Sequence, residues 1–320
     1  MRYVEVDGLR VSVIGLGTWQ FGTREWGYGH EYAHQVAPDL VHRATALGIT
    51  LVDTAESYGP RTSEHIVGEA VLTLEAQARA SLTIATKFTP LAPTEAIVRR
   101  QVEGSARRLG VGAIDLLYAH WPNPFVSVRR TMQSLRPLVV EGLVRRPAVS
   151  NYSLAQWQEA ERALRHPVYA DQVPFSLVKP RPAADLVPYA AAMGRLVVAS
   201  SPLGQGVLAR VGAGSDGTPN PVRRFNPLWR GAAAERLLPL QVAVRDVARY
   251  RDRVRVRHDP REGDLRRRRA DGPGDVPNGD LERQQALRGL PSPQRVEPAD
   301  GVGRAVRART DPREHALPQR

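Results

Sequence analysis

The stretch "LTIATKFTPLAPTEAIVRRQVEGSARRLGVGAIDLLYAH" (residues 82–120) contains two short apolar runs separated by an amphipathic segment. The runs "LTIATKF" and "IDLLYAH" have the length and composition of buried strands. The intervening "TEAIVRRQVEGSARRLG" keeps a helical period, with Thr94 as the expected N-cap and Gly110 as the expected stop. Two strands joined by one crossover helix are typical of parallel pairing, so this stretch predicts an α/β fold.

The same alternation continues on both sides of this stretch, through residues 1–250. Another helix is expected in "SLAQWQEAERALRH", capped by Ser153, and a hairpin in "RYVEVDGLRVSV", turning at Asp7-Gly8. Seven parallel strands are expected in all. A (β/α)8 TIM barrel needs one more. The other five candidate strands are "VIGLGTW", "ITLVDTA", "PAVSNY", "ADQVPFSL" and "RLVVASSPL".

Residues 251–320 have a different composition. They contain 17 Arg but no Lys, Ile, Phe, Tyr, Trp or Met, and Pro and Gly are frequent. Such a segment cannot bury enough apolar surface to offset its chain entropy. We therefore expect an incomplete barrel over residues 1–250 and a disordered tail over residues 251–320, with the eighth strand and helix missing or replaced by this tail.

Composition argues against several classes of function. The formal net charge is +12, but the densest basic stretch, Arg266 to Arg269, has no aromatic residue near it, so we expect no nucleic-acid partner. The absence of cysteine excludes disulfides and thiolate metal sites, and no metal is expected. No apolar run is long enough for a membrane span or a signal peptide, which predicts a cytoplasmic protein. The sequence indicates no oligomeric state.

Polar residues that could carry chemistry follow three neighbouring strands. Asp53 and Tyr58 follow "ITLV", Lys87 lies in "IATKF", and His120 ends "LLYAH". Active sites of such barrels lie at the carboxyl ends of the strands. A buried ammonium at Lys87 needs a partner such as Asp53 and would lower the pKa of the Tyr58 phenol. Tyr58 could then protonate a carbonyl oxygen, with a second hydrogen bond from His120.

At these residues the chain resembles the aldo-keto reductase superfamily. Coverage is about residues 1–250. The resemblance implies a (β/α)8 barrel closed at the bottom by the hairpin, and reduction of a small aldehyde or ketone with NADPH, or alternatively NADH. It also implies the catalytic tetrad Asp53, Tyr58, Lys87 and His120. The motifs that carry it, in the family's order, are "GLGTWQFG", "LVDTAESYG", "IATKF", "LLYAHWP", "VSNYS", "DQVPFSL" and "SPLGQGVL".

The resemblance further implies which residues bind the cofactor and the substrate. The nicotinamide carboxamide would be held by Ser150, Asn151 and Gln172, with the ring face of Phe175 beside it. The substrate pocket would be walled by Trp19, Trp26 and Trp121. The other expected cofactor-binding residues are Gly17, Thr18, Trp19 and Asp53, and, along the pyrophosphate, Ser201, Pro202, Leu203, Gly204 and Gly206.

The chain also departs from the family pattern. Pro147 lies in a strand that should be central, where it removes a backbone donor. The eighth strand and its phosphate loop have no match, and a one-base shift of the reading frame near residue 250 would explain the loss. Two alternatives to a working reductase therefore stay open: a cofactor-binding protein without catalysis, like the regulatory subunits of potassium channels, or a defective frameshifted product.

A Rossmann fingerprint is the remaining alternative for the "GLGTW" motif. That fingerprint requires G-x-G-x-x-G at the start of a helix. Here Gly15 and Gly17 are followed only by Gly22, and the next segment, "REWGYGH", does not resemble a helix. The spacing therefore disfavours this fold.

Overall fold

Seven parallel strands form one sheet in chain order, and they confirm the seven strands expected from the sequence. In the computed structural model the sheet is curled like part of a barrel, with helices on its outer side, as in the (β/α)8 fold. The strands are β3 (Gly15–Gly17), β4 (Leu51–Asp53), β5 (Thr83–Phe88), β6 (Leu116–Ala119), β7 (Pro147–Ser150), β8 (Ala170–Pro174) and β9 (Leu196–Ser200).

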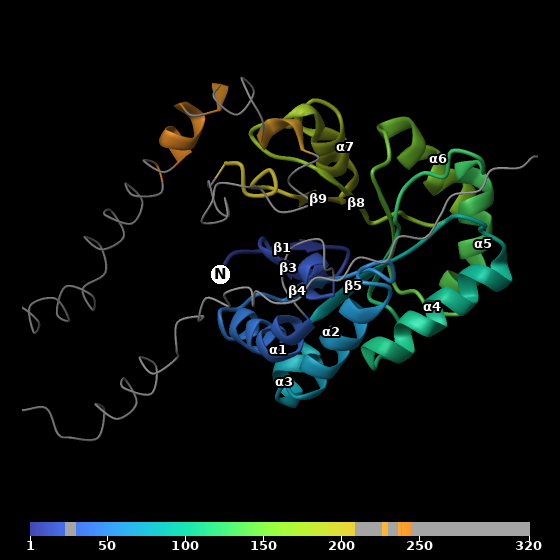
Figure 1. Cartoon of the computed structure of the whole chain (residues 1–320). Coiled ribbons are helices and arrows are strands. Elements are labelled where there is room, and N and C mark those ends of the chain that lie inside the picture. The colour runs from blue at the N-terminus through green and yellow to red at the C-terminus, as the bar shows by residue number, and fades with distance from the viewer. Residues whose placement is uncertain (23–29, 209–225, 230–235, 238, 245–246, 248–320) are drawn as a thin grey trace, which may run out of the picture. The chain divides into compact units, whose positions relative to one another are not determined.

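Helices follow the strands and cover the outer face of the sheet. Figure 1 shows α1, α2, α4, α5 and α6 succeeding one another around this face, and each packs against the next. α7 packs against β9. The helices are α1 (His30–Ala46), α2 (Thr62–Leu72), α3 (Ala76–Ala80), α4 (Glu95–Leu109), α5 (Val128–Val140), α6 (Leu154–Leu164) and α7 (Leu186–Met193), with short 3₁₀ turns η1 (Trp19–Phe21), η3 (Arg181–Ala183) and η4 (Pro227–Trp229).

The structure describes residues 1–22, 30–208, 226–229, 236–237, 239–244 and 247. All of them belong to one compact unit, Met1–Asp252. The predicted tail over residues 251–320 and Trp26 lie outside the described residues. No helix among the described residues has the length and apolar character needed to cross a membrane.

The ends of the helices lie where the sequence places them. Thr94 caps α4 by accepting a hydrogen bond from the backbone N–H of Ile97, and Gly110 ends the helix with a left-handed φ of 68°. Ser153 begins α6 in a reciprocal capping box with Gln156. These local interactions satisfy backbone groups that the helix itself leaves unpaired. Both predicted helices are confirmed.

The N-terminal hairpin closes the lower end of the curled sheet. β1 (Tyr3–Val6) pairs with β2 (Leu9–Ser12), and Asp7 and Gly8 between them have φ of 49° and 70°, as a two-residue type I′ turn requires. The hairpin supplies Val6, Leu9 and Val11 to the core inside the curled sheet. There they join a layer of strand residues, namely Leu51, Ala85, Leu116, Tyr118, Ala148, Tyr169 and Ala170.

Strand periodicity decides which side chains reach the interior. Val52, Ile84 and Leu117 belong to the outer core beneath the helices, whereas their neighbours in the chain face inward. Because successive side chains alternate between faces, Lys87 shares the inner face with Ala85. Parallel register places Lys87 opposite Tyr118. The polar residues at the carboxyl ends of these strands therefore converge above the hairpin-capped core.

Pro147 is accommodated at the very start of its strand. β7 begins at this residue, which is paired in register with Leu117 and is buried. The carbonyl of Pro147 accepts a hydrogen bond from the backbone N–H of Tyr169. A proline at the first strand position removes no ladder bond that the sheet needs there.

Candidate active site

Asp53 and Lys87 form a buried ion pair at the carboxyl ends of β4 and β5. The Lys87 Nζ lies 2.5 Å from Asp53 Oδ1 and also donates to the carbonyl of Thr54 at 2.8 Å. The side chain of Lys87 is 1% exposed and that of Asp53 is 14% exposed. Burial lowers the pKa of Lys87, but the charge of Asp53 and the contacts with Tyr58 outweigh it, so the pKa is raised and the ammonium persists.

Tyr58 lies directly above this pair. The Lys87 Nζ is 4.9 Å from the centroid of its ring, and the Trp19 ring stacks on it with centroids 6.1 Å apart. The expected lowering of the Tyr58 pKa is wrong for this structure. Burial raises the pKa of the phenol above 10.0, and the charge and hydrogen bond of Lys87 only partly offset that effect. The phenol therefore keeps its proton at neutral pH.

His120 completes the group of four residues. Its ring meets the Tyr58 ring edge-on, with centroids 5.7 Å apart, and the centroid of the Trp121 ring lies 4.6 Å from its own. Burial and the charge of Lys87 lower the pKa of His120 to about 3. The imidazole is thus neutral at physiological pH, and one of its ring nitrogens carries a hydrogen that it can donate. The structure brings together all four residues expected to be catalytic.

Ser150, Asn151 and Gln172 form a second cluster next to Asp53. Gln172 Nε2 donates to Asp53 Oδ2 at 2.9 Å, and the Ser150 hydroxyl donates to the carbonyl of Gln172 at 2.8 Å. Asn151 Nδ2 donates to Ser150 Oγ and to the carbonyl of His120. Neither Asn151 Oδ1 nor Gln172 Oε1 accepts a hydrogen bond from a described residue. These amide oxygens are suited to the N–H₂ group of a carboxamide.

Gly17 ends β3, and Thr18 and Trp19 follow it along the same rim. Gly17 pairs in register with Asp53, and Thr18 donates its hydroxyl to the carbonyl of Asp53 at 2.9 Å. Thr18 is fully buried and also bonds Ser63 Oγ. Its side chain thus fastens the ends of β3, β4 and α2 to one another. Trp19 is 36% exposed and borders the site.

A tight turn over residues 201–208 follows β9. Ser201, Gly204 and Gly206 have positive φ, and a Cβ at Gly204 would lie 2.7 Å from Val207 Cγ1. The turn therefore requires glycine at this position. It contains Pro202 and Leu203 as well, so the residues expected along the pyrophosphate occupy one compact turn. Phe175 lies beside it, with its N–H bonded to the carbonyl of Ser200.

The structure adds functional candidates that the sequence reading did not select. Glu56 is buried in the loop that leads to Tyr58, and Ser57 Oγ lies 3.3 Å from His120 Nδ1. Asp171 is fully buried on β8, and no described residue is hydrogen-bonded to its carboxyl oxygens by side chain. Burial raises its pKa to about 8. The spacing "DTAESYG" offered a signal for Glu56 only, as an acid beside the expected phenol.

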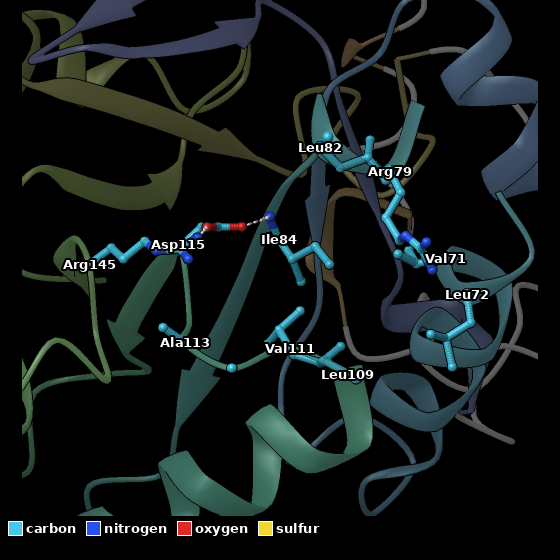
Figure 2. A pocket seen from close by; sticks show the side chains of 13 residues that line it. Val71, Leu72, Arg79, Leu82, Ile84, Leu109, Val111, Ala113, Asp115 and Arg145 are labelled. Atoms are coloured by element: carbon cyan, nitrogen blue, oxygen red, sulfur yellow. Dashed lines mark hydrogen bonds and ion pairs between the residues drawn. The ribbon is translucent and has the colours of Figure 1, made fainter. Parts of the chain in front are cut away.

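A separate hollow of about 370 Å³ lies at the opposite, amino end of the strands. Figure 2 shows it between Val71, Leu82 and Leu109, with Arg145 paired to Asp115 at its edge. Asp115 also accepts the backbone N–H of Ile84. None of the residues expected to be catalytic or to bind the cofactor lines this hollow. Because barrel chemistry takes place at the carboxyl ends, this hollow is not the active site.

Comparison with known protein families gives one match that spans most of the chain. The model of the aldo/keto reductase family matches residues 13–252. An uncharacterized oxidoreductase of Mycobacterium tuberculosis is 46% identical over 249 residues, which cover 78% of this chain and 76% of that protein. The aldo-keto reductase YhdN of Bacillus subtilis is 34% identical over 200 residues, 59% of this chain and 58% of that one.

Solved structures agree with this match. The glycerol dehydrogenase AKR11B4 from Gluconobacter oxydans superposes with a TM-score of 0.68 at 28% identity, covering 78% of each chain. An aldo-keto reductase from Klebsiella pneumoniae in complex with NADPH has a TM-score of 0.55 at 28% identity, covering 64% of this chain and 70% of that one.

Proposed function

The chain belongs to the aldo/keto reductase family, and from this premise we propose that it reduces aldehydes or ketones to alcohols with NADPH. The observation that carries the proposal is the buried Asp53–Lys87 pair with the Tyr58 ring 4.9 Å from the Lys87 ammonium. A protonated phenol, a fixed cation and a neutral imidazole are thus neighbours. Such a group suits an oxygen that gains negative charge.

Tyr58 would act as the general acid. Its raised pKa keeps the hydroxyl protonated at neutral pH, so the proton is present when a carbonyl oxygen begins to gain charge. The proton would pass from the Tyr58 hydroxyl to that oxygen. Lys87 would stabilise the phenolate that remains, because its ammonium is held in place by Asp53 and by the Thr54 carbonyl.

His120 would orient the substrate. With its pKa lowered to about 3, the ring is neutral and offers an N–H as a second donor to the carbonyl oxygen. Ser57 Oγ faces Nδ1 at 3.3 Å, which favours the proton on the other ring nitrogen if the serine donates. Two donors on one oxygen polarise the carbonyl and fix its direction.

The nicotinamide cofactor, when bound, would supply hydride to the carbonyl carbon. Ser150, Asn151 and Gln172 would hold its carboxamide, which is supported by the free amide oxygens of Asn151 and Gln172 beside Asp53. The turn over residues 201–206 would bind the pyrophosphate. NADPH is preferred over NADH on the resemblance and on the NADPH complex of the Klebsiella relative.

Trp19 and Trp121 would form walls of the substrate pocket, since they flank Tyr58 and His120 respectively. The substrate would thus be a small carbonyl compound that packs against aromatic rings. The test is titration of the purified 320-residue protein with NADPH, followed by tryptophan fluorescence, and then NADPH oxidation with a panel of aldehydes and ketones. Saturable micromolar binding with turnover supports the proposal. A folded protein that binds no nicotinamide cofactor contradicts it.

A further inference from the structure

We propose that Glu56 is a positioning residue that holds the Tyr58 hydroxyl in its place relative to Lys87. This inference rests on the proposed function, because it concerns how the general acid is oriented. Glu56 lies in the loop between β4 and α2, two residues before Tyr58, and only 7% of it is exposed. A carboxyl so well covered needs hydrogen-bond donors.

The hydrogen-bond donors to the Glu56 side chain come from the residue after β5 and from α4. Oε1 accepts the backbone N–H of Thr89 at 2.7 Å and Nε2 of Gln101 at 2.9 Å. Thr89 follows directly after β5, whereas Gln101 lies on α4. Gln101 Nε2 also donates to the carbonyl of Thr89 at 3.1 Å. Glu56, Thr89 and Gln101 are thus each hydrogen-bonded to the other two.

The backbone of Glu56 is tied to the same strand. Its N–H donates to the carbonyl of Lys87 at 3.3 Å, and its own carbonyl accepts the N–H of Arg61 at 2.8 Å. The loop is therefore anchored to the end of β5, which carries Lys87, at a position two residues before Tyr58. On its far side, the carbonyl of Tyr58 accepts the N–H of Ser63 at 3.2 Å.

Removing this anchor should move the phenol and spare the rest of the site. Lys87 Nζ bonds to Asp53 and to the carbonyl of Thr54, and Asp53 also accepts from Gln172, so none of these side-chain bonds involves Glu56. Displacement of a catalytic group by about 1 Å can reduce turnover on the order of 100-fold. Loss of the anchor should therefore lower kcat while leaving cofactor affinity and substrate KM nearly unchanged.

Two substitutions of Glu56 separate hydrogen bonding from charge. Glu56→Ala removes the acceptor and should lower kcat for NADPH-dependent reduction of a carbonyl substrate about 100-fold. Glu56→Gln retains an oxygen at Oε1 and should recover kcat to within about threefold of the wild type, since the donors keep their partner. A Gln variant as impaired as the Ala variant would overturn the hydrogen-bond role.

Glu64→Gln is the matched control for loss of stability alone. Glu64 is a second fully buried carboxylate, bonded to Thr86 Oγ1 at 2.6 Å and to Arg108 Nε at 2.7 Å, away from the site. It should lower the melting temperature with little effect on kcat. If Glu56→Ala changed kcat no more than Glu64→Gln at equal stability, the positioning role would be overturned.

A readout independent of turnover separates this inference from the proposed function. The pKa of Tyr58 can be followed by NMR of ¹³C-tyrosine-labelled protein, with Tyr58→Phe to assign the signal. Burial raises this pKa and Lys87 acts to lower it, so displacement of the hydroxyl in Glu56→Ala should shift the pKa by at least about half a unit, whereas Glu56→Gln should leave it unchanged. An unchanged pKa in the Ala variant overturns the inference, even if the wild type shows no turnover.

Discussion

Asp53 joins the two halves of the site, because one of its oxygens lies 2.5 Å from Lys87 Nζ and the other accepts Gln172 Nε2 at 2.9 Å. One carboxylate thus fixes both the cation beside Tyr58 and the amide expected at the nicotinamide. The position of Lys87 beside Tyr58 is thereby linked to the position of the Gln172 amide. Substitution of Asp53 or Lys87 should therefore disturb both parts of the site.

Substitution Lys87→Met should abolish most turnover and lower stability as well. The variant leaves the Asp53 carboxylate buried without its cation, which costs about 3–5 kcal/mol. Loss of the phenolate-stabilising charge should lower kcat at least about 100-fold. Urea denaturation and steady-state kinetics measure the two effects. The double variant with Asp53→Asn should regain part of the stability and none of the activity; recovered activity would contradict the role of Lys87.

The rate of reduction should be independent of pH over the neutral range. Tyr58 must be protonated to donate, and its pKa lies above 10.0, so activity should fall only as the pH rises through that raised value. His120 is neutral above its pKa of about 3 and adds no step near neutrality. A profile of kcat/KM from pH 5 to pH 11 checks this. A fall centred near pH 7 would contradict both assignments.

Asp171→Asn should stabilise the protein at alkaline pH. The pKa of Asp171 is raised from 3.8 to about 8, so the folded state favours the neutral acid. Such a group contributes most to stability below pH 3.8, and that contribution is lost as the pH rises toward 8. The isosteric amide carries no charge at any pH. Its melting temperature should exceed the wild type by several degrees near pH 8 and match it near pH 4; a constant difference would argue against titration of Asp171.

Gly59→Ala should be more harmful than a comparable substitution in the hairpin. Gly59 has φ of 55°, and a Cβ there would lie 2.0 Å from the carbonyl oxygen of Gly22. Gly8 has φ of 70° but open space around it. Gly8→Ala therefore measures the cost of the left-handed backbone alone, about 1–2 kcal/mol. The free energy of unfolding should fall further in Gly59→Ala. Equal losses would mean that the loop after Tyr58 adapts freely.

Local signals predicted much of the fold correctly. Thr94, Ser153 and the Asp7-Gly8 turn act through neighbours within a few residues, so their sequence context is sufficient to identify them. The seven strands were also recognisable, because each is a short apolar run between helical segments. The observed strands are shorter than the quoted runs, because the last residues of most runs belong to the loops that follow the strands.

Other properties depend on distant contacts that a single sequence does not reveal. The bonds of Glu56 require Thr89 and Gln101 to come from two other elements. The direction of the Tyr58 pKa depends on the balance between burial and the charge of Lys87, and only the structure shows that burial is larger. The neutral state expected for Asp171 likewise follows from the complete burial of this residue on β8, which composition does not indicate.

The most direct test of the central claim compares the wild type with Tyr58→Phe in two parallel measurements. NADPH affinity is followed by tryptophan fluorescence, and NADPH oxidation is followed with an aldehyde that the wild type reduces. The phenylalanine ring keeps the stacking on Trp19 but has no proton to give. We expect cofactor affinity within about twofold of the wild type and a loss of kcat of at least about 100-fold. Turnover that survives the substitution would contradict Tyr58 as the general acid.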